Sequence, residues 1–208
     1  MTVNAAITVI DYGTGNIGSV LNMIKHVGGT VEVAWDAQAV VGARKILLPG
    51  VGSFDNAMSR LDNLGLIEPL KERASAGVPF LGICLGMQLL ANRSEEGKLE
   101  GLGLIPGQVR RFQFVGEEAS FKIPHMGWNR ASPVKSHPLI AGLVDDARFY
   151  FVHSYFFDCV DSENILLRSS YGGTFTSGVQ RGNVMGVQFH PEKSHRYGMH
   201  LIKNFVGI

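Results

Sequence analysis

The first half of the chain alternates short apolar runs with segments of helical periodicity, and this alternation constrains the fold more than any other feature. The apolar runs are short and continuous, as in strands buried on both faces of a sheet, and occupy residues 7–10, 31–35, 46–48 and 79–83. Helical patterns follow them at residues 17–27, about 53–61, about 67–76 and from 85 onward. We therefore predict an α/β fold with an open, mainly parallel sheet flanked by helices.

The second half has a different pattern. Strand-like runs, separated by turn signals and with little helix between them, occupy residues 109–114, 149–157, 165–171, 175–180 and 184–189. They predict an antiparallel extension, which makes the whole sheet mixed. Ser194 is placed to cap a last helix, whose inward face would carry Met199, Leu201, Ile202 and Phe205. Because no linker or internal repeat interrupts these patterns, we expect one domain over residues 1–208.

Composition excludes several classes of function. The 19 basic and 18 acidic residues give a net charge of +1, which provides no basic surface for nucleic acid or an anionic membrane. No apolar run approaches the roughly 20 residues that cross a bilayer, and the first residues lack the features of a signal peptide. The two cysteines, Cys84 and Cys159, form no C-x-x-C motif, which is typical of a reducing compartment. We expect a cytoplasmic protein with neither nucleic-acid nor membrane partners.

Residues 82–86 carry the strongest chemical motif, Gly-Ile-Cys-Leu-Gly, at the junction of a strand and a helix. This G-x-C-x-G pattern is the nucleophile elbow with sulfur in place of oxygen. Its glycines allow a sharp turn that lifts Cys84 to the edge of the sheet, and a helix N-terminus favours the thiolate of a nearby cysteine. The alternative interpretation is a buried cysteine in a glycine-containing turn.

A second motif, His190-Pro191-Glu192, follows the last predicted strand. A carboxylate on one imidazole nitrogen fixes the tautomer and leaves the other nitrogen free to exchange a proton with a thiol. Cys84, His190 and Glu192 are therefore the predicted catalytic residues. His153 is the competing base, although it has no acid nearby in sequence and alternation could make it a core residue. A metal site using His195 as well lacks a suitable ligand spacing, so we predict no metal.

A glycine-rich loop at Gly50, Val51 and Gly52 lies between a strand and a helix. Glycine permits a backbone N–H to turn towards a developing oxyanion, and the N–H of Leu85, next after the nucleophile, is the natural second donor. We assign the predicted oxyanion hole to Val51, Gly52 and Leu85. The alternative is an ordinary strand-to-helix loop.

Residues 13–18 form a literal G-x-G-x-x-G, with Asp36 about where a ribose-binding acid belongs. This combination is typical of a dinucleotide-binding oxidoreductase. However, Asp11 would face the pyrophosphate unfavourably, and the second half does not repeat the βαβ unit. We favour a tight turn before a helix and predict no cofactor.

Together these residues resemble the class I glutamine amidotransferases over essentially the whole chain. Residues 82–88 match the family's nucleophile motif, and residues 190–192 match its His–Glu pair. Finer matches to the glutaminase subunits of imidazole glycerol phosphate synthase lie at residues 11–16, 49–54, 124–129, 151–155 and 190–194. The anthranilate and carbamoyl-phosphate relatives usually carry proline where this chain has Val51. The resemblance also implies a flavodoxin-like arrangement of the sheet.

The resemblance implies a complete activity. The Cys84 thiolate would attack the side-chain amide of L-glutamine, and water would hydrolyse the thioester to glutamate. Ammonia would pass to a separate cyclase, a (β/α)₈ barrel in a heterodimer, which makes imidazole glycerol phosphate and aminoimidazole carboxamide ribotide in histidine biosynthesis. Substrate contacts are implied at Gly50, Gln88, Glu96, Ser154 and Tyr155, and the partner interface at Asn16, Trp128, Tyr150 and Lys193.

Three rival functions stay open at this point. They are a nucleotide-binding oxidoreductase, a non-catalytic binding subunit with an inert Cys84, and a different amidotransferase such as the glutaminase of pyridoxal phosphate synthesis. We also expect the isolated chain to be nearly idle, because a glycine-flanked peptide can hold its N–H away from the oxyanion until a partner favours the flipped loop.

Overall fold

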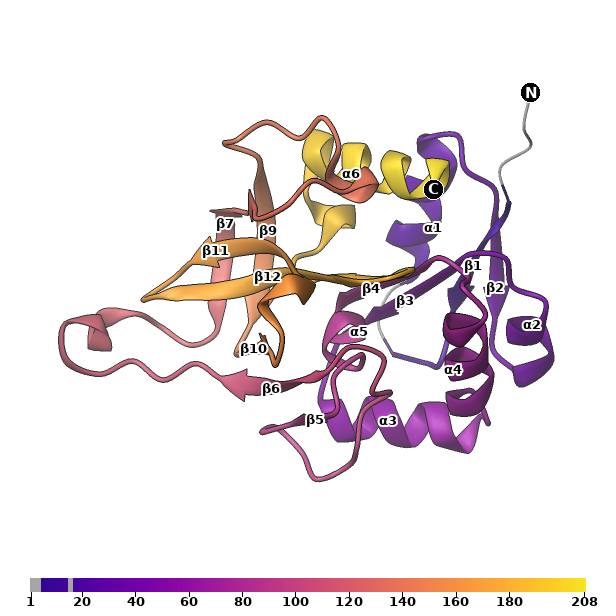
Figure 1. The fold of residues 1–208 in the computed structure, drawn as a ribbon, viewed down its shortest axis with the longest axis horizontal. Helices are drawn as coiled ribbons and strands as arrows, with labels where there is room; N and C mark the ends of the chain where they lie inside the picture. Colours follow the sequence, from indigo (N-terminus) through magenta and orange to yellow (C-terminus); the bar gives the residue numbers. More distant parts are fainter. Residues whose placement is uncertain (1–4, 15–16) are drawn as a thin grey trace.

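A computed structural model of the protein describes residues 5–14 and 17–208. Within these residues the chain forms a mixed sheet flanked by helices and a separate two-stranded sheet. Figure 1 shows α1 (Ile17–His26) and α6 (His195–Gly207) on one face of the main sheet, and α3 (Phe54–Asn63) and α4 (Ile67–Ser75) on the other. Each face buries its own apolar cluster. The predicted fold class is confirmed.

The parallel half contains the four predicted strands, β1 (Ile7–Ile10), β2 (Val31–Ala34), β3 (Ile46–Gly50) and β4 (Phe80–Cys84). Three of them are buried along their whole length, which explains their continuous apolar sequences. A short helix that we did not predict, α2 (Ala37–Val41), follows β2. Asp36 caps it by accepting a hydrogen bond from the Ala39 N–H at 2.9 Å.

The last strand of the chain joins this parallel half. β13 (Val184–Val187) lies parallel to β4, with Val187 opposite Ile83, and the main order begins β2-β1-β3-β4-β13. This is the flavodoxin-like order of strands. The carboxyl ends of β4 and β13 therefore meet at one edge of the sheet, where ligands of such folds bind.

The predicted antiparallel extension is also present. From β13 the sheet continues through β12, β10 and β6, with antiparallel pairing at each step. β11 and β8 branch from β12, and β5 closes the far edge by parallel pairing with β6. Their bounds are β5 (Arg93–Ser94), β6 (Gly107–Arg111), β8 (Ser132–Pro133), β10 (Tyr155–Cys159), β11 (Ile165–Ser170) and β12 (Thr174–Arg181).

The prediction of a single strand at residues 149–157 was wrong. The structure divides it at Ser154 into β9 (Arg148–His153) and β10, which belong to different sheets. β9 pairs antiparallel with β7 (His125–Arg130), a strand that we did not predict. The apolar pattern does not reveal this division at Ser154, because side chains of both strands enter buried clusters. Only the change of hydrogen-bonding partner marks it.

Two helix predictions need smaller corrections. The helix after Cys84 is only α5 (Leu85–Gln88), and the buried residues Leu89 and Ala91 lie beyond its end. Ser194 precedes α6 but makes no side-chain cap, because its hydroxyl is used elsewhere. Short 3₁₀ segments occupy Gly116–Ser120, Pro138–Ile140, Ser162–Asn164 and Pro191–Lys193. Among the helices described, none has the length and apolar character that crossing a membrane requires.

Candidate active site

Cys84 lies on a strained turn between β4 and α5. Its φ of 54° and ψ of −112° are rare for a residue with a side chain, and such strain is concentrated at functional sites. The flanking glycines make the turn possible. A Cβ on Gly86 would lie 1.9 Å from the Leu48 carbonyl oxygen, and one on Gly82 would lie 2.5 Å from the Gly86 oxygen. The G-x-C-x-G spacing therefore corresponds to a close crossing of backbone segments.

His190 is fixed by its backbone and by Glu192. Its N–H donates to the Tyr150 carbonyl at 2.9 Å, and its own carbonyl accepts from the Ser194 hydroxyl at 2.6 Å. Its Nδ1 lies 2.7 Å from Glu192 Oε1. The buried Nε2 has no hydrogen-bond partner of ordinary geometry among the residues that the structure describes. This nitrogen is therefore the one available for proton exchange.

The charge state of His190 follows from its neighbours. Burial alone lowers the pKa of His190, but the adjacent Cys84 sulfur and the Glu192 carboxylate outweigh burial and raise that pKa to about 10. The imidazolium form of His190 is thus favoured at this position. A protonated imidazole next to a thiolate is the arrangement that activates a cysteine nucleophile.

The carboxyl ends of β4 and β13 open into a cavity of about 350 Å³. Most of the predicted catalytic, oxyanion and substrate residues line it: Val51, Gly52, Cys84, Leu85, Gln88, Glu96, Ser154, Tyr155 and His190. Gly50 does not line this cavity. It borders a small space of about 20 Å³ behind the loop, together with Glu192, and a Cβ on it would lie 2.4 Å from the Tyr12 hydroxyl. Position 50 therefore requires glycine because the Tyr12 side chain packs against it.

The predicted oxyanion loop is exposed at the mouth of the cavity. Val51 is 44% exposed, and Gly52 has a φ of +105°, which favours glycine. A Cβ on Gly52 would meet no atom within 4 Å. Since neither residue is packed in place, the loop has room to turn a peptide group.

A chain of polar side chains links the cavity wall to the nucleophile. Gln88 Nε2 donates to the Tyr155 carbonyl and to Gln188 Oε1, both at 3.0 Å. Gln188 Nε2 in turn lies 3.8 Å from Cys84 Sγ. Sequence reasoning missed Gln188. The available signal was one glutamine in the otherwise apolar run at residues 184–189, where a buried amide needs partners.

His153 is not placed to act as the base, because both of its ring nitrogens are hydrogen-bonded within the protein. Its Nδ1 donates to the Tyr155 carbonyl at 2.8 Å, and its Nε2 accepts from His125 Nδ1 at 2.9 Å. His125 Nε2 completes the series by accepting from Asn129 Nδ2 at 3.2 Å. These roles follow from the one tautomer assignment that satisfies every bond. Burial lowers the pKa of His153 to about 3 and that of His125 to about 4, so both rings are neutral and fully occupied.

Several residues of the metal and dinucleotide interpretations make other contacts within the protein. The His195 ring stacks on Trp128, with centroids 5.3 Å apart, and the described part of the chain holds no cluster of three or more His, Cys, Asp or Glu that could bind a metal. The Asp36 carboxylate caps α2, and Asp11 accepts a hydrogen bond from the Gly13 N–H. Gly15, the second glycine of the motif, lies outside the described residues.

Three of the four predicted partner residues form one surface cluster. Trp128 is 46% exposed and meets Tyr150 edge-on, while Lys193 Nζ lies 5.7 Å from the centre of the Tyr150 ring. Tyr150 is also the residue whose carbonyl holds His190, so the cluster adjoins the catalytic pair. Asn16 lies outside the described residues.

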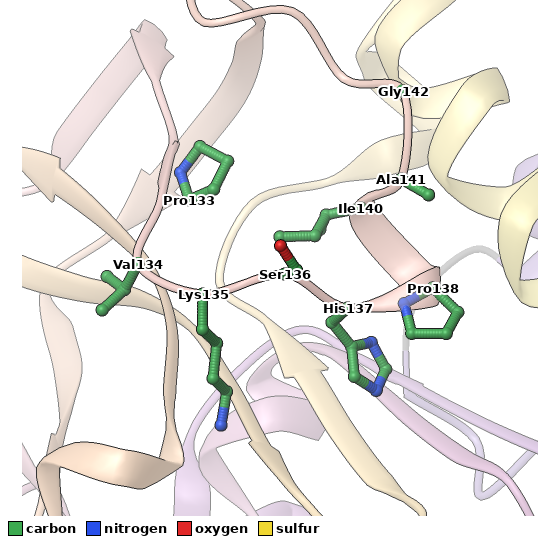
Figure 2. Close-up of a pocket in the computed structure, with 9 residues that line it drawn as sticks. All are labelled: Pro133, Val134, Lys135, Ser136, His137, Pro138, Ile140, Ala141 and Gly142. Atoms are coloured by element: carbon green, nitrogen blue, oxygen red, sulfur yellow. The ribbon is translucent and has the colours of Figure 1, made fainter.

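A larger cavity, of about 720 Å³, lies elsewhere, along residues 133–142. Figure 2 shows the Lys135 and His137 side chains on one side of this segment and Ser136 on the other. Lys135 donates to the Glu163 carbonyl, and His137 accepts from the Leu139 N–H. Because its polar groups diverge and hold the backbone, this cavity does not resemble a reaction site.

The comparisons with known proteins agree with this site. The family model of the class-I glutamine amidotransferases matches residues 8–208, and the chain belongs to that family. It is 50% identical over 203 residues to the imidazole glycerol phosphate synthase subunit HisH of Bdellovibrio bacteriovorus, covering 97% of this chain and 100% of that protein. It is 48% identical over 201 residues to subunit HisH 2 of Methanococcus maripaludis, covering 96% and 98%.

Solved structures agree on the fold. A crystal structure of a glutamine amidotransferase matches with a TM-score of 0.75 and 17% identity, covering 97% of this chain and 99% of that one. The PurLQS structure from Thermotoga maritima matches with a TM-score of 0.73 and 18% identity, covering 98% of each chain. At these identities the likeness concerns the arrangement of strands and helices.

Proposed function

We propose that this chain, as one domain over residues 1–208, hydrolyses L-glutamine and delivers the ammonia to the cyclase of imidazole glycerol phosphate synthase. The observation that carries the proposal is the His190–Glu192 pair, with Nδ1 and Oε1 2.7 Å apart and Nε2 left free beside Cys84. Membership of the amidotransferase family and the similarity to HisH subunits support it further.

The reaction divides into two steps at Cys84. In the first, the thiolate sulfur attacks the side-chain carbonyl carbon of glutamine, and His190 gives its proton to the departing nitrogen, releasing ammonia and leaving a thioester. In the second, His190 takes a proton from water as the water adds to the thioester. The C–S bond then breaks and glutamate leaves. Glu192 keeps the imidazole oriented in both steps.

The cavity supplies the groups that hold glutamine. Glu96 is the one acidic side chain among the cavity-lining residues, and its charge suits the α-ammonium group of the substrate. Gln88 uses both amide hydrogens within the protein, so its oxygen is left to accept. The N–H groups of Val51, Gly52 and Leu85 are the proposed donors to the oxyanion of the tetrahedral intermediate.

The proposed partner is a separate cyclase chain, a (β/α)₈ barrel. We propose that its docking surface includes Trp128, Tyr150 and Lys193, and the family resemblance adds Asn16 to the proposed interface. The exposed Val51 loop is the proposed point of control, because an oxyanion hole without one donor loses roughly 10²–10³ in rate. Both cysteines are free, which suits a cytoplasmic location.

The test is to measure glutamate release by the pure chain, by the chain with the cyclase, and by the chain with the cyclase and its nucleotide ligand. We expect turnover to rise along this series. Cys84→Ala should abolish glutamine hydrolysis in every arm, while added ammonia should still support the cyclase reaction of the complex. Substantial glutaminase turnover by pure Cys84→Ala would contradict the proposed function. Equal, high turnover in all three wild-type arms would contradict only the control by the partner.

A further inference from the structure

The loop at residues 94–99 and the first turn of α3 hold each other through two carboxylates. Asp55, in that turn, accepts hydrogen bonds from the Lys98 N–H at 2.9 and 3.0 Å and from the Leu99 N–H at 3.1 Å. In the opposite direction, Glu96 Oε2 accepts from the Phe54 N–H at 2.9 Å. Charge-assisted bonds of this kind are stronger than neutral ones, so the loop and the helix form one unit.

The sequence accommodates this arrangement at neighbouring positions. A Cβ on Gly97 would lie 1.9 Å from Asp55 Oδ1, so the loop carries glycine where the carboxylate approaches it most closely. The buried Ser94 hydroxyl accepts from the Glu96 N–H at 3.0 Å. Glu96 is therefore fixed by its own backbone, by its side chain and by the chain just after it.

The 94–99 loop, held by the first turn of α3, borders the active-site cavity. Glu96 lines the cavity, and one of its carboxylate oxygens is used by Phe54, which leaves the other for a ligand. Asp55 is absent from the cavity lining, although α3 begins two residues after Gly52 of the oxyanion loop. A shift of the 94–99 loop would thus move the anionic group that faces the substrate while leaving Cys84 and His190 in place.

We propose that Asp55 is a positioning residue for glutamine recognition, because it clamps the loop that presents Glu96 to the substrate's α-ammonium group. The proposal rests on the proposed glutaminase function. Asp55 makes no contact with the substrate in this proposal. Removing its carboxylate should therefore weaken recognition of the α-ammonium group while Cys84 keeps its reactivity.

The experiment compares two alkylating agents that react at Cys84. The first is a diazoketone analogue of glutamine, which carries the α-ammonium group, and the second is iodoacetamide, which lacks it. We expect Asp55→Ala to lower the second-order inactivation rate by the glutamine analogue on the order of tenfold, equivalent to about 1.4 kcal/mol. Its rate with iodoacetamide should stay within about twofold of wild type. With the cyclase bound, KM for glutamine should rise by a similar factor while kcat changes little.

Matched variants complete the design. Asp62→Ala, on the exposed side of the same helix, should change neither rate. Glu96→Gln should lower the rate with the glutamine analogue, and adding Asp55→Ala to it should cause little further loss. Asp55→Asn keeps one acceptor oxygen and should fall between wild type and Asp55→Ala, which provides a milder variant if the alanine variant folds poorly.

The outcomes separate the two proposals. Equal losses with both reagents, or no loss with either, in Asp55→Ala or in the folded Asp55→Asn variant would overturn the role of Asp55 while leaving the glutaminase intact. A wild-type chain that neither hydrolyses glutamine with its cyclase nor reacts faster with the glutamine analogue than with iodoacetamide would overturn the proposed function, and this inference with it.

Discussion

At the scale of single residues, the site consists of a nucleophile held by its backbone and a histidine whose charge is set by its neighbours. Cys84 is held in a strained conformation by the strand and helix on either side. His190 is held by one backbone bond from β9 and by the Glu192 carboxylate. Because the Cys84 sulfur and the Glu192 carboxylate together raise the pKa of His190, losing either should lower that pKa.

The His190 pair gives the first prediction. His190→Ala should lower glutamine hydrolysis by the cyclase complex roughly 10²–10⁴-fold, the usual contribution of general acid–base help. Glu192→Gln should lower it less and should reduce the pKa of His190 from its value of about 10. Since a raised pKa keeps the imidazolium until pH rises through it, the variant should lose its ring proton at lower pH. NMR titration of the His190 ring between pH 5 and 11 measures this shift.

His26→Ala is the control, because His26 is exposed near the end of α1. It should retain wild-type turnover with the cyclase. An unchanged titration midpoint in Glu192→Gln would mean that Glu192 does not set the charge of His190.

Sequence reasoning located residues that belong to short motifs and missed those that do not. Cys84 and the His190–Glu192 pair lie in patterns of five and three residues, each with a mechanical meaning. Gln188 and His125 belong to no such motif, and only their three-dimensional partners reveal their use. His153 was ambiguous for the same reason, until the bonds at both of its ring nitrogens were visible.

At the scale of elements, the β4–α5 turn depends on backbone proximity more than on side-chain contacts. The second glycine of the motif faces the backbone oxygen of Leu48 in β3, which is itself paired with β4. A backbone atom in a central strand has little freedom to move away. This turn is therefore the least tolerant part of the site.

We predict that Gly86→Ala will destabilise the chain by about 3 kcal/mol or more and abolish glutaminase activity, because its Cβ would lie 1.9 Å from the Leu48 oxygen. Gly42→Ala is the matched control. Gly42 has a φ of −82° and open space around its Cβ position, so alanine there should be neutral or stabilising by up to about 1 kcal/mol. Urea unfolding measures both changes. Equal stability of the two variants would contradict the close crossing.

Strands were predictable where their own sequence pattern is sufficient to define them, and not where their bounds depend on a distant partner strand. β1, β3 and β4 were predictable because both of their faces are covered, so that their sequences are almost continuously apolar. β7 has one buried residue, His125, and otherwise alternates exposed with partly buried residues, so its sequence lacks a comparable apolar run. The division of residues 149–157 into β9 and β10 depends on which strands lie alongside, and these are distant in sequence.

At the scale of the whole molecule, one buried feature makes stability depend on pH. His125 and His153 are neutral in the folded state, with pKa values of about 4 and about 3, against about 6.5 for an ordinary histidine. Between these values the unfolded chain binds protons that the folded chain does not. Stability contributed by the neutral pair is therefore complete above pH 6.5 and is lost as pH falls towards 4.

The corresponding prediction concerns His125→Gln, whose amide can replace both ring hydrogen bonds without titrating. Wild-type free energy of unfolding should fall between pH 7.5 and 5, with a loss of about 2 kcal/mol attributable to each of His125 and His153. The variant should lose about 2 kcal/mol less over that range, as measured by urea unfolding at both pH values. His26→Gln is the exposed control and should follow the wild type. Identical pH dependence in wild type and His125→Gln would show that His125 is protonated equally in both states.

The order of strands was the part of the architecture least accessible from sequence. The run at residues 184–189 was expected in the antiparallel extension, and β13 does pair that way with β12. Its other edge pairs parallel with β4, from the first half of the chain. No local pattern specifies this second pairing, because it forms between segments about a hundred residues apart, each apolar on both faces.

The insertion of β13 beside β4 also sets the order in which activity appears during synthesis. His190 lies more than a hundred positions after Cys84, so at about 5–20 residues per second a growing chain carries the nucleophile for about 5–20 s before its base has been made. Throughout that interval the edge of β4 lacks its neighbour and the thiol lacks its imidazole. A growing chain that has not yet reached His190 therefore cannot release ammonia from glutamine, and activity first becomes possible once β13 and the histidine that follows it have been made.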